Sequence, residues 1–292
     1  MKTLSVTIIV LAILTGCNSG KSVEKNFLSG LQTRGNDLTC DNVYLSVNDE
    51  KTNQTTFVYG QKFKMNFTDI RGFKGENGNV FPGMQIFIID QSGDTVLRSN
   101  DLYQKYKDGL NLSPLLLHAD LTAASPISSG NEYRMIVNIW DKKGKGTFKG
   151  EVDFKIIPNE YLKINSEGVA FNEIYLFSRE RSAAITDNKI KLNENTSLIF
   201  EGLTGFKEEN DRVFPGMSLK ARDDDNNAIL EYDDLFLEYS DSGLSKSDFY
   251  SGVSSSFSLP TGQYKTPIHF IVTIWDKRGN AKITVETDLV PE

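Results

Sequence analysis

The chain has 292 residues, of which 39% are hydrophobic and 24% are charged, and this is the composition of a water-soluble globular protein. Its 32 basic residues are outnumbered by 39 acidic ones, so we expect no nucleic-acid partner. Two cysteines and two histidines are too few for a disulfide framework or a thiolate and imidazole metal cage, and we expect no cofactor.

The first residues have the pattern of an export signal. Lys2 precedes an apolar run at residues 6–14, and the small residues Thr15 and Gly16 follow it. A membrane-spanning helix needs about 20 apolar residues, so this run is too short to span a bilayer. We therefore predict a cleaved signal peptide over residues 1–16.

Leu14-Thr15-Gly16-Cys17 resembles the lipobox of bacterial lipoproteins. The resemblance implies that the Cys17 thiol receives a diacylglycerol, that the signal is cut before it, and that the new amino group is acylated. Asn18, where an Asp would favour the inner membrane, implies an outer-membrane protein held by its N-terminal lipid, with the membrane face left open. The alternative is a plain secretory signal that ends beside a cysteine. The polar residues that follow predict a flexible tether over residues 17–30.

A tandem repeat organises the remaining sequence. Residues 72–84 recur as residues 205–217 with ten of thirteen positions identical, and residues 139–144 recur as residues 274–279. The two copies, 31–158 and 162–292, are each of single-domain size.

Both copies have the hydrophobic pattern of β-strands. Residues 133–140 and 268–275 alternate between apolar and polar, and each segment leads through Asp-Lys-(Lys/Arg)-Gly into a second alternating segment. We predict a hairpin there with its glycine in a left-handed conformation, and type II turns at Pro82-Gly83 and Pro215-Gly216. The sequence thus predicts an all-β fold of two tandem antiparallel immunoglobulin-like β-sandwich domains. It resembles the tandem immunoglobulin-like modules of bacterial surface lipoproteins, a likeness of architecture that transfers no binding residues.

Aromatic residues in the repeats are the candidates for a binding surface. Alternation places Trp140 and Trp275 opposite the core, where an exposed indole face is a platform for a sugar. The alternative is a bulge that turns each Trp inward. Phe73 and Phe206, in the repeated loop, either face a partner or plug the end of a sandwich.

One strand differs between the copies. Phe87 and Ile89 occupy outward positions that hold Lys220 and Arg222 in the second copy. A solvated strand alternates as the second copy does, so we expect the first strand to be covered on both faces. The cover is the second domain, the domain's own loops or another protein, and we expect it to lie within the chain.

Acidic residues occupy equivalent turns in the two copies. Asp90 and Asp94 in the first, and Asp223 and Asp225 in the second, are the candidates for Ca²⁺ ligands. Asp, Asn and Gly also form solvated turns for backbone reasons alone. The complete loop pattern of a calcium site is absent from both turns, so we expect no metal.

The sequence contains no Gly-x-Ser-x-Gly elbow and no His-Glu-x-x-His motif. The leading hypothesis is a non-catalytic, lipid-anchored cell-envelope protein whose domains bind a glycan or an envelope protein. A spacer or scaffold without a ligand is the alternative, and a hydrolase with an unrecognised site is the third.

Overall fold

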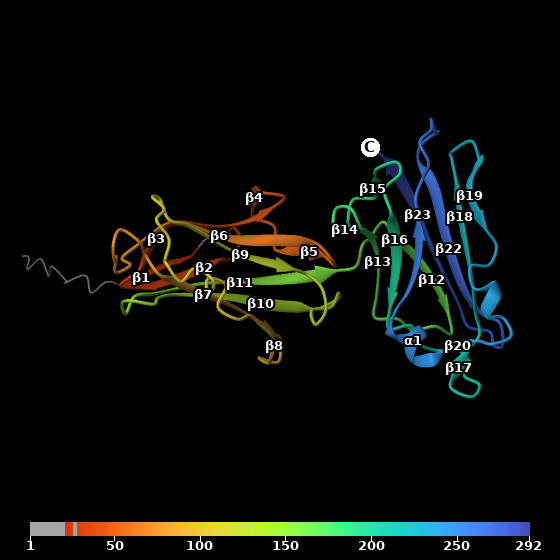
Figure 1. Ribbon diagram of the computed structural model, residues 1–292, viewed down its shortest axis with the longest axis horizontal. Coiled ribbons are helices and arrows are strands. Elements are labelled where there is room, and N and C mark those ends of the chain that lie inside the picture. The colour runs from red at the N-terminus through yellow and green to blue at the C-terminus, as the bar shows by residue number, and fades with distance from the viewer. Residues whose placement is uncertain (1–20, 26–27) are drawn as a thin grey trace, which may run out of the picture.

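The computed structural model describes residues 21–25 and 28–292, and this part of the chain is almost entirely β-structure. The strands form two antiparallel, immunoglobulin-like β-sandwiches in tandem, so the predicted fold class is confirmed (Figure 1). Strands of the first sandwich run along the long axis of the molecule, and those of the second run across it. Cys17 and the predicted signal peptide at 1–16 lie outside the described residues. Within the described residues, no helix has the length and hydropathy of a membrane span.

The first domain packs a large sheet against a smaller one. The large sheet contains, in spatial order, β1 (Lys21–Lys25), β2 (Gln32–Asn36), β11 (Thr147–Ile157), β10 (Glu132–Asp141), β7 (Pro82–Asp90) and β8 (Thr95–Arg98), while β5 (Thr56–Val58) pairs parallel with β11. The facing sheet contains β4 (Glu50–Thr52), β3 (Thr39–Val47), β6 (Lys62–Arg71) and β9 (Leu116–Thr122).

The second domain repeats this plan. Its large sheet contains β12 (Lys163–Glu167), β23 (Lys282–Pro291), β22 (Ile268–Asp276), β18 (Pro215–Arg222) and β19 (Ala228–Tyr232), while β15 (Lys189–Ile190) pairs parallel with β23. The facing sheet contains β14 (Ala183–Ile185), β13 (Glu173–Ser178), β16 (Thr196–Glu201) and β21 (Val253–Phe257). A short pair, β17 (Arg212–Val213) and β20 (Leu244–Ser245), a 3-10 turn η1 (Leu237–Tyr239) and a helix α1 (Lys246–Ser251) complete it.

The sequence repeat is therefore a structural repeat, strand by strand, from β2 and β12 to β11 and β23. The first domain has one addition, β1, which pairs antiparallel with β2. This corrects the expectation of a flexible tether over all of 17–30. The strand is held by backbone pairing, and its side chains are mostly exposed, so hydrophobic alternation could not reveal it.

Each domain encloses its own hydrophobic core. One cluster of buried side chains comes from residues between Leu31 and Ile156, and the other comes from residues between Leu162 and Leu289. The predicted inward face of β10 is confirmed, because its alternate apolar residues from Tyr133 to Ile139 are all buried. Polar residues between them point to the outer face of the large sheet, which is the face on which a binding site can lie.

Two turn predictions were wrong for one physical reason. Pro82 and Gly83 begin β7, and no left-handed conformation occurs at Gly83 or at Gly144. A Cβ at Gly144 would lie 2.3 Å from the Asp141 Oδ2 atom. Glycine is needed at these positions because a side chain does not fit there, and its freedom in φ is not used.

Candidate functional site

The duplicated motifs meet at one end of each sandwich. In the first domain the Asp141 carboxylate, which is 6% exposed, accepts hydrogen bonds from the backbone N–H groups of Lys74 (2.7 Å) and Lys143 (2.9 Å). Asp141 thereby ties the β10–β11 turn to the loop before β7. Asp276 makes the equivalent bonds in the second domain.

A lysine from the same turn makes a second tie. The Lys142 Nζ atom lies 2.7 Å from Asp101 Oδ2, and the other oxygen of Asp101 accepts the backbone N–H of Met84 at 3.0 Å. Lys277 and Asp234 form the same ion pair at 2.7 Å. The most similar part of the two copies is thus a structural frame, which leaves the differences between them to carry function.

This frame fixes the two tryptophans. Trp140 on β10 stands opposite Gly83 on β7, and a Cβ at Gly83 would lie 2.1 Å from the indole Cε2 atom. Trp275 and Gly216 repeat the arrangement, with a corresponding distance of 2.2 Å. Both indoles lie on the outer face of the sheet and are half-buried, and neither is turned into the core.

A hollow of about 380 Å³ opens beside Trp140. Side chains from three neighbouring strands form its walls. They stand side by side because β10 pairs in register with β11 and β11 pairs in register with β2. The outward-facing residues that line it are Arg34, Asn36, Asn138, Trp140, Thr147 and Lys149. Its volume lies within the range of small-ligand sites.

The chemistry of this hollow is that of a site for a polar ligand with an apolar face. Trp140 offers an aromatic surface, Asn138 offers an amide, and Arg34 offers a guanidinium. Among residues 21–25 and 28–292, no acidic side chain pairs with Arg34. Lys149 pairs with Glu151 on its own strand.

The second domain lacks these groups at the same register. Asn165 stands in the place of Arg34 and Thr284 in the place of Lys149. Thr284 shares a hydrogen bond of 3.1 Å with Thr273, which replaces Asn138. Lys282 stands directly opposite Trp275, and Glu167 stands opposite Lys282, where the first domain has Thr147 and Asn36. The two tryptophans therefore have different surroundings.

Phe87 and Ile89 lie on the outer face of β7 and are half-buried. The Arg98 guanidinium of β8 lies over the Phe87 ring at 5.3 Å, and Ile136 stands opposite Phe87 on β10. The cover that we expected within the chain is therefore supplied by neighbouring strands of the same sheet.

For Phe206 the structure agrees with the second alternative, a side chain that plugs the end of the sandwich, and it rules out display to a partner. It is 5% exposed and packs on the ring of Phe249 at 4.7 Å, so it cannot face a partner. Phe73 is half-buried against the first core. Both side chains plug the ends of their sandwiches.

In the acidic turns, aspartate carboxylates accept hydrogen bonds from backbone N–H groups of the same turn. Asp90 Oδ1 accepts hydrogen bonds from the backbone N–H groups of Ser92 and Asp94, each at 3.0 Å. Asp223 accepts from the Asn227 backbone N–H at 2.8 Å, and Asp225 lies 3.9 Å from the Lys265 ammonium. Among the described residues, no group of three His, Cys, Asp or Glu side chains is placed to hold a metal ion.

Further acids line a second hollow, of about 500 Å³, at the other end of the same sheet face. Asp153 pairs with Arg134 at 2.6 Å, and Glu132 accepts from the Gln91 amide at 3.1 Å. These carboxylates are held by partners on their own or adjacent elements, as structural ion pairs are. This hollow and the one at Trp140 have Lys149 in common in their linings.

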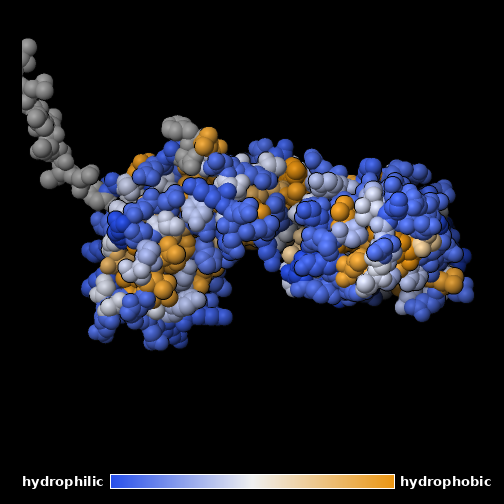
Figure 2. All heavy atoms as spheres, turned by 90° about the horizontal axis from the view of Figure 1, so that it is seen from above, coloured by the Kyte–Doolittle hydropathy of each residue, from blue (hydrophilic) through white to orange (hydrophobic). Residues whose placement is uncertain are grey.

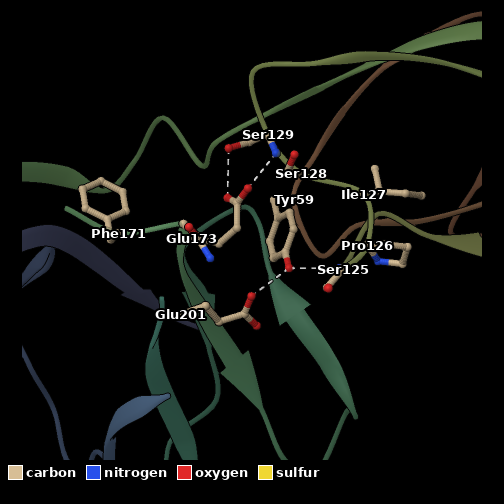
Figure 3. A pocket seen from close by; sticks show the side chains of 10 residues that line it. Tyr59, Ser125, Pro126, Ile127, Ser128, Ser129, Phe171, Glu173 and Glu201 are labelled. Carbon is tan, nitrogen blue, oxygen red and sulfur yellow. Dashed lines mark hydrogen bonds between the residues drawn. The ribbon is translucent and has the colours of Figure 1, made fainter. Parts of the chain in front are cut away.

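The junction between the domains contains a third cavity, of about 450 Å³ (Figure 3). Glu173 of the second domain is 4% exposed and accepts the backbone N–H (2.6 Å) and hydroxyl (2.9 Å) of Ser129 in the first. Tyr59 and Tyr175 donate their hydroxyls to the two oxygens of Glu201, at 3.0 and 2.8 Å. All four carboxylate oxygens have donors, which makes the junction an ordered contact.

Burial is the main cause of the raised pKa values at this junction. It raises the pKa of Glu173 above its ordinary value, and the nearby negative charge of Glu201 adds to the effect. Burial also raises the pKa of Tyr59 and of Tyr175, so both hydroxyls stay protonated even farther above neutral pH than an ordinary tyrosine does.

Most of the visible surface is hydrophilic, with apolar patches on both domains (Figure 2).

No family model matches the chain, and no curated protein matches it. Among solved structures, the C-terminal domain of the AgI/II polypeptide BspA of Streptococcus agalactiae is similar at 10% identity and a TM-score of 0.23, over 84% of this chain and 99% of that one. Fibronectin(III)-like modules of Clostridium thermocellum CbhA are similar at 7% identity and a TM-score of 0.20, over 85% and 94%. Likenesses at these scores transfer no function.

Sequence reasoning identified Trp140 but missed Arg34 and Lys149. The signal for Lys149 was its place opposite Asn138 in the predicted hairpin. Arg34 lies in a polar segment without alternation, and only the register of β2 reveals its position. Glu173 and Ser129 are far apart in sequence, and no local pattern joins them.

Proposed function

We propose that this chain is a non-catalytic, lipid-anchored envelope protein whose first domain binds a glycan in the hollow beside Trp140. The observation that carries the proposal is the position of the indole, which lies against Gly83 within reach of an amide and an unpaired guanidinium. Sugars have apolar C–H faces and polar hydroxyls, and this combination of groups suits both.

The test is a binding experiment on the mature chain made without lipid. Trp140→Ala is expected to weaken glycan binding at least tenfold, because it removes the aromatic surface from the hollow. Trp275→Ala is the matched control, since it removes the equivalent indole from a face that has Asn165 and Thr284 in the places of Arg34 and Lys149, and it is expected to leave affinity unchanged. Isothermal calorimetry against glycans selected from an array measures both.

Two results would count against this site. Equal losses in the two variants would mean that a general role of the motif, and not the hollow, governs binding. If no glycan binds the parent chain, the spacer or scaffold role becomes the better explanation of the ordered junction.

The anchor is part of the proposal and has its own test. Cys17→Ala in the full chain is expected to abolish palmitate labelling and to move the protein from the membrane fraction to the soluble fraction. Asn18 supports outer-membrane localisation, which density separation of the two membranes measures. Membrane association that survives the substitution would rule out lipid as the anchor.

A further inference from the structure

We infer that the ligand of the Trp140 hollow is the acidic sugar headgroup of a glycolipid in the leaflet that holds the protein. This inference rests on the proposed function and adds the ligand's charge and source to it. Three observations support it: the charge of the hollow, the position of β1, and the length of chain back to Cys17.

The charge of the hollow favours an anion. The protein has a formal net charge of -7, yet the side chains that line this hollow include Arg34 and Lys149 and no acid. Arginine binds phosphate or carboxylate through paired N–H donors, and Arg34 has no acidic partner among the described residues that an anion would have to displace.

The strand β1 adds a third cation. Lys21 stands opposite Asn36, and Asn36 stands opposite Thr147 at the edge of the hollow. Directly opposed residues in an antiparallel pair point to the same face, so Lys21 lies on the face of Trp140. The second domain has no counterpart of β1 among its described strands, and Asn165 and Thr284 stand in the places of Arg34 and Lys149.

The chain length places this site near the membrane. Lys21 follows Cys17 by four residues, which span at most about 14 Å when extended. Three strand spacings separate Lys21 from Trp140 across the sheet, about 14 Å more. With Cys17 lipidated, the hollow therefore lies within about 28 Å of the anchoring lipid. A headgroup in the same leaflet is within reach.

The experiment uses the mature chain with Cys17→Ser, so that any binding to vesicles comes from the protein surface. Vesicles of phosphatidylcholine, of phosphatidylcholine with phosphatidylglycerol, and of phosphatidylcholine with a phosphorylated diglucosamine lipid are compared by sedimentation, the last two at equal surface charge. We expect at least tenfold tighter binding to the diglucosamine vesicles than to either of the others.

The variant pair uses the chain's own repeat. Arg34→Asn with Lys149→Thr gives these two positions the side chains that the second domain has there, and it is expected to abolish the preference. Asn165→Ala with Thr284→Ala, at the same register in the second domain, is the control and is expected to retain it.

The outcomes separate this inference from the proposed function. Equal binding to both anionic vesicles would overturn the inference, because surface charge alone would then explain attachment. Trp140-dependent binding of soluble neutral glycans, unaffected by the Arg34 and Lys149 substitutions, would also overturn it but leave the glycan site standing. If the parent chain binds neither soluble glycans nor any of the vesicles, both the inference and the proposed glycan site are wrong.

Discussion

The indole of Trp140 lies against Gly83 on the neighbouring strand, so closely that any side chain at position 83 would overlap it. The glycine of one repeated motif thus leaves the space that the tryptophan of the other motif occupies. This explains why both motifs are kept together in the two copies. It also offers a way to move the indole without removing it.

We expect Gly83→Ala to displace the Trp140 ring from the sheet and to destabilise the protein by about 1–3 kcal/mol, as overpacking does. Urea unfolding gives the stability change, and Trp fluorescence of a Trp275→Phe background gives the environment of Trp140. Gly216→Ala is expected to cost a similar amount while leaving glycan affinity unchanged. A Gly83→Ala protein with unaltered fluorescence would contradict the contact.

The buried Asp141 carboxylate is expected to be more important for stability than its surface ion-pair neighbours. Asp141→Ala leaves two backbone N–H groups without their acceptor, which costs about 1–3 kcal/mol for each group that water cannot reach. Asp153→Ala, which breaks an exposed pair with Arg134, is the control and is expected to cost less than about 1 kcal/mol. Similar losses in chemical denaturation would show that the Asp141 tie is solvated.

Glu173 predicts a specific pH dependence. Because its pKa in the folded protein is raised, the group contributes stability at low pH, below its ordinary pKa, and this contribution is lost as pH rises through the raised value. Glu173→Gln cannot ionise and keeps an acceptor for the Ser129 N–H. The variant is therefore expected to gain stability relative to the parent as pH rises from 4 to 7. Thermal melts across this range measure the difference, and a difference that does not change with pH would contradict the raised pKa.

The apolar stripe on β7 is expected to contribute modestly to stability. Replacing Phe87 with Lys and Ile89 with Arg gives the first domain the side chains of the second. Because both residues are half-buried, we expect a loss of about 1.5–3 kcal/mol in total, roughly half the value of full burial for each side chain. Denaturant midpoints test this. A loss above about 4 kcal/mol would mean that the pair is fully covered, and no loss would mean an open patch.

The sequence was a good guide wherever one side chain's position depends on its neighbours along the strand. The repeat and the alternation of residues 133–140 predicted both sandwiches and the outward position of Trp140. Phe206 was harder, because an aromatic residue in a loop is compatible with display and with burial, and only the contact with Phe249 decides. Glycines misled the turn predictions, since a residue pattern shows where glycine occurs but not which neighbour occupies the space above it. The Ser129–Glu173 contact depends on how two domains meet, which no local pattern encodes.

The strand β1 has a consequence for how copies of this protein meet one another. In the first domain it occupies the edge of β2, so the backbone donors and acceptors there already have partners. A chain that began at residue 31 would present β2 as an open edge, ready to pair with a second molecule. The corresponding edge in the second domain, β12, is open, but it carries Lys163 and Glu167 at its two ends. Self-association of truncated chains should therefore begin at β2, the edge that β1 covers in the longer chain.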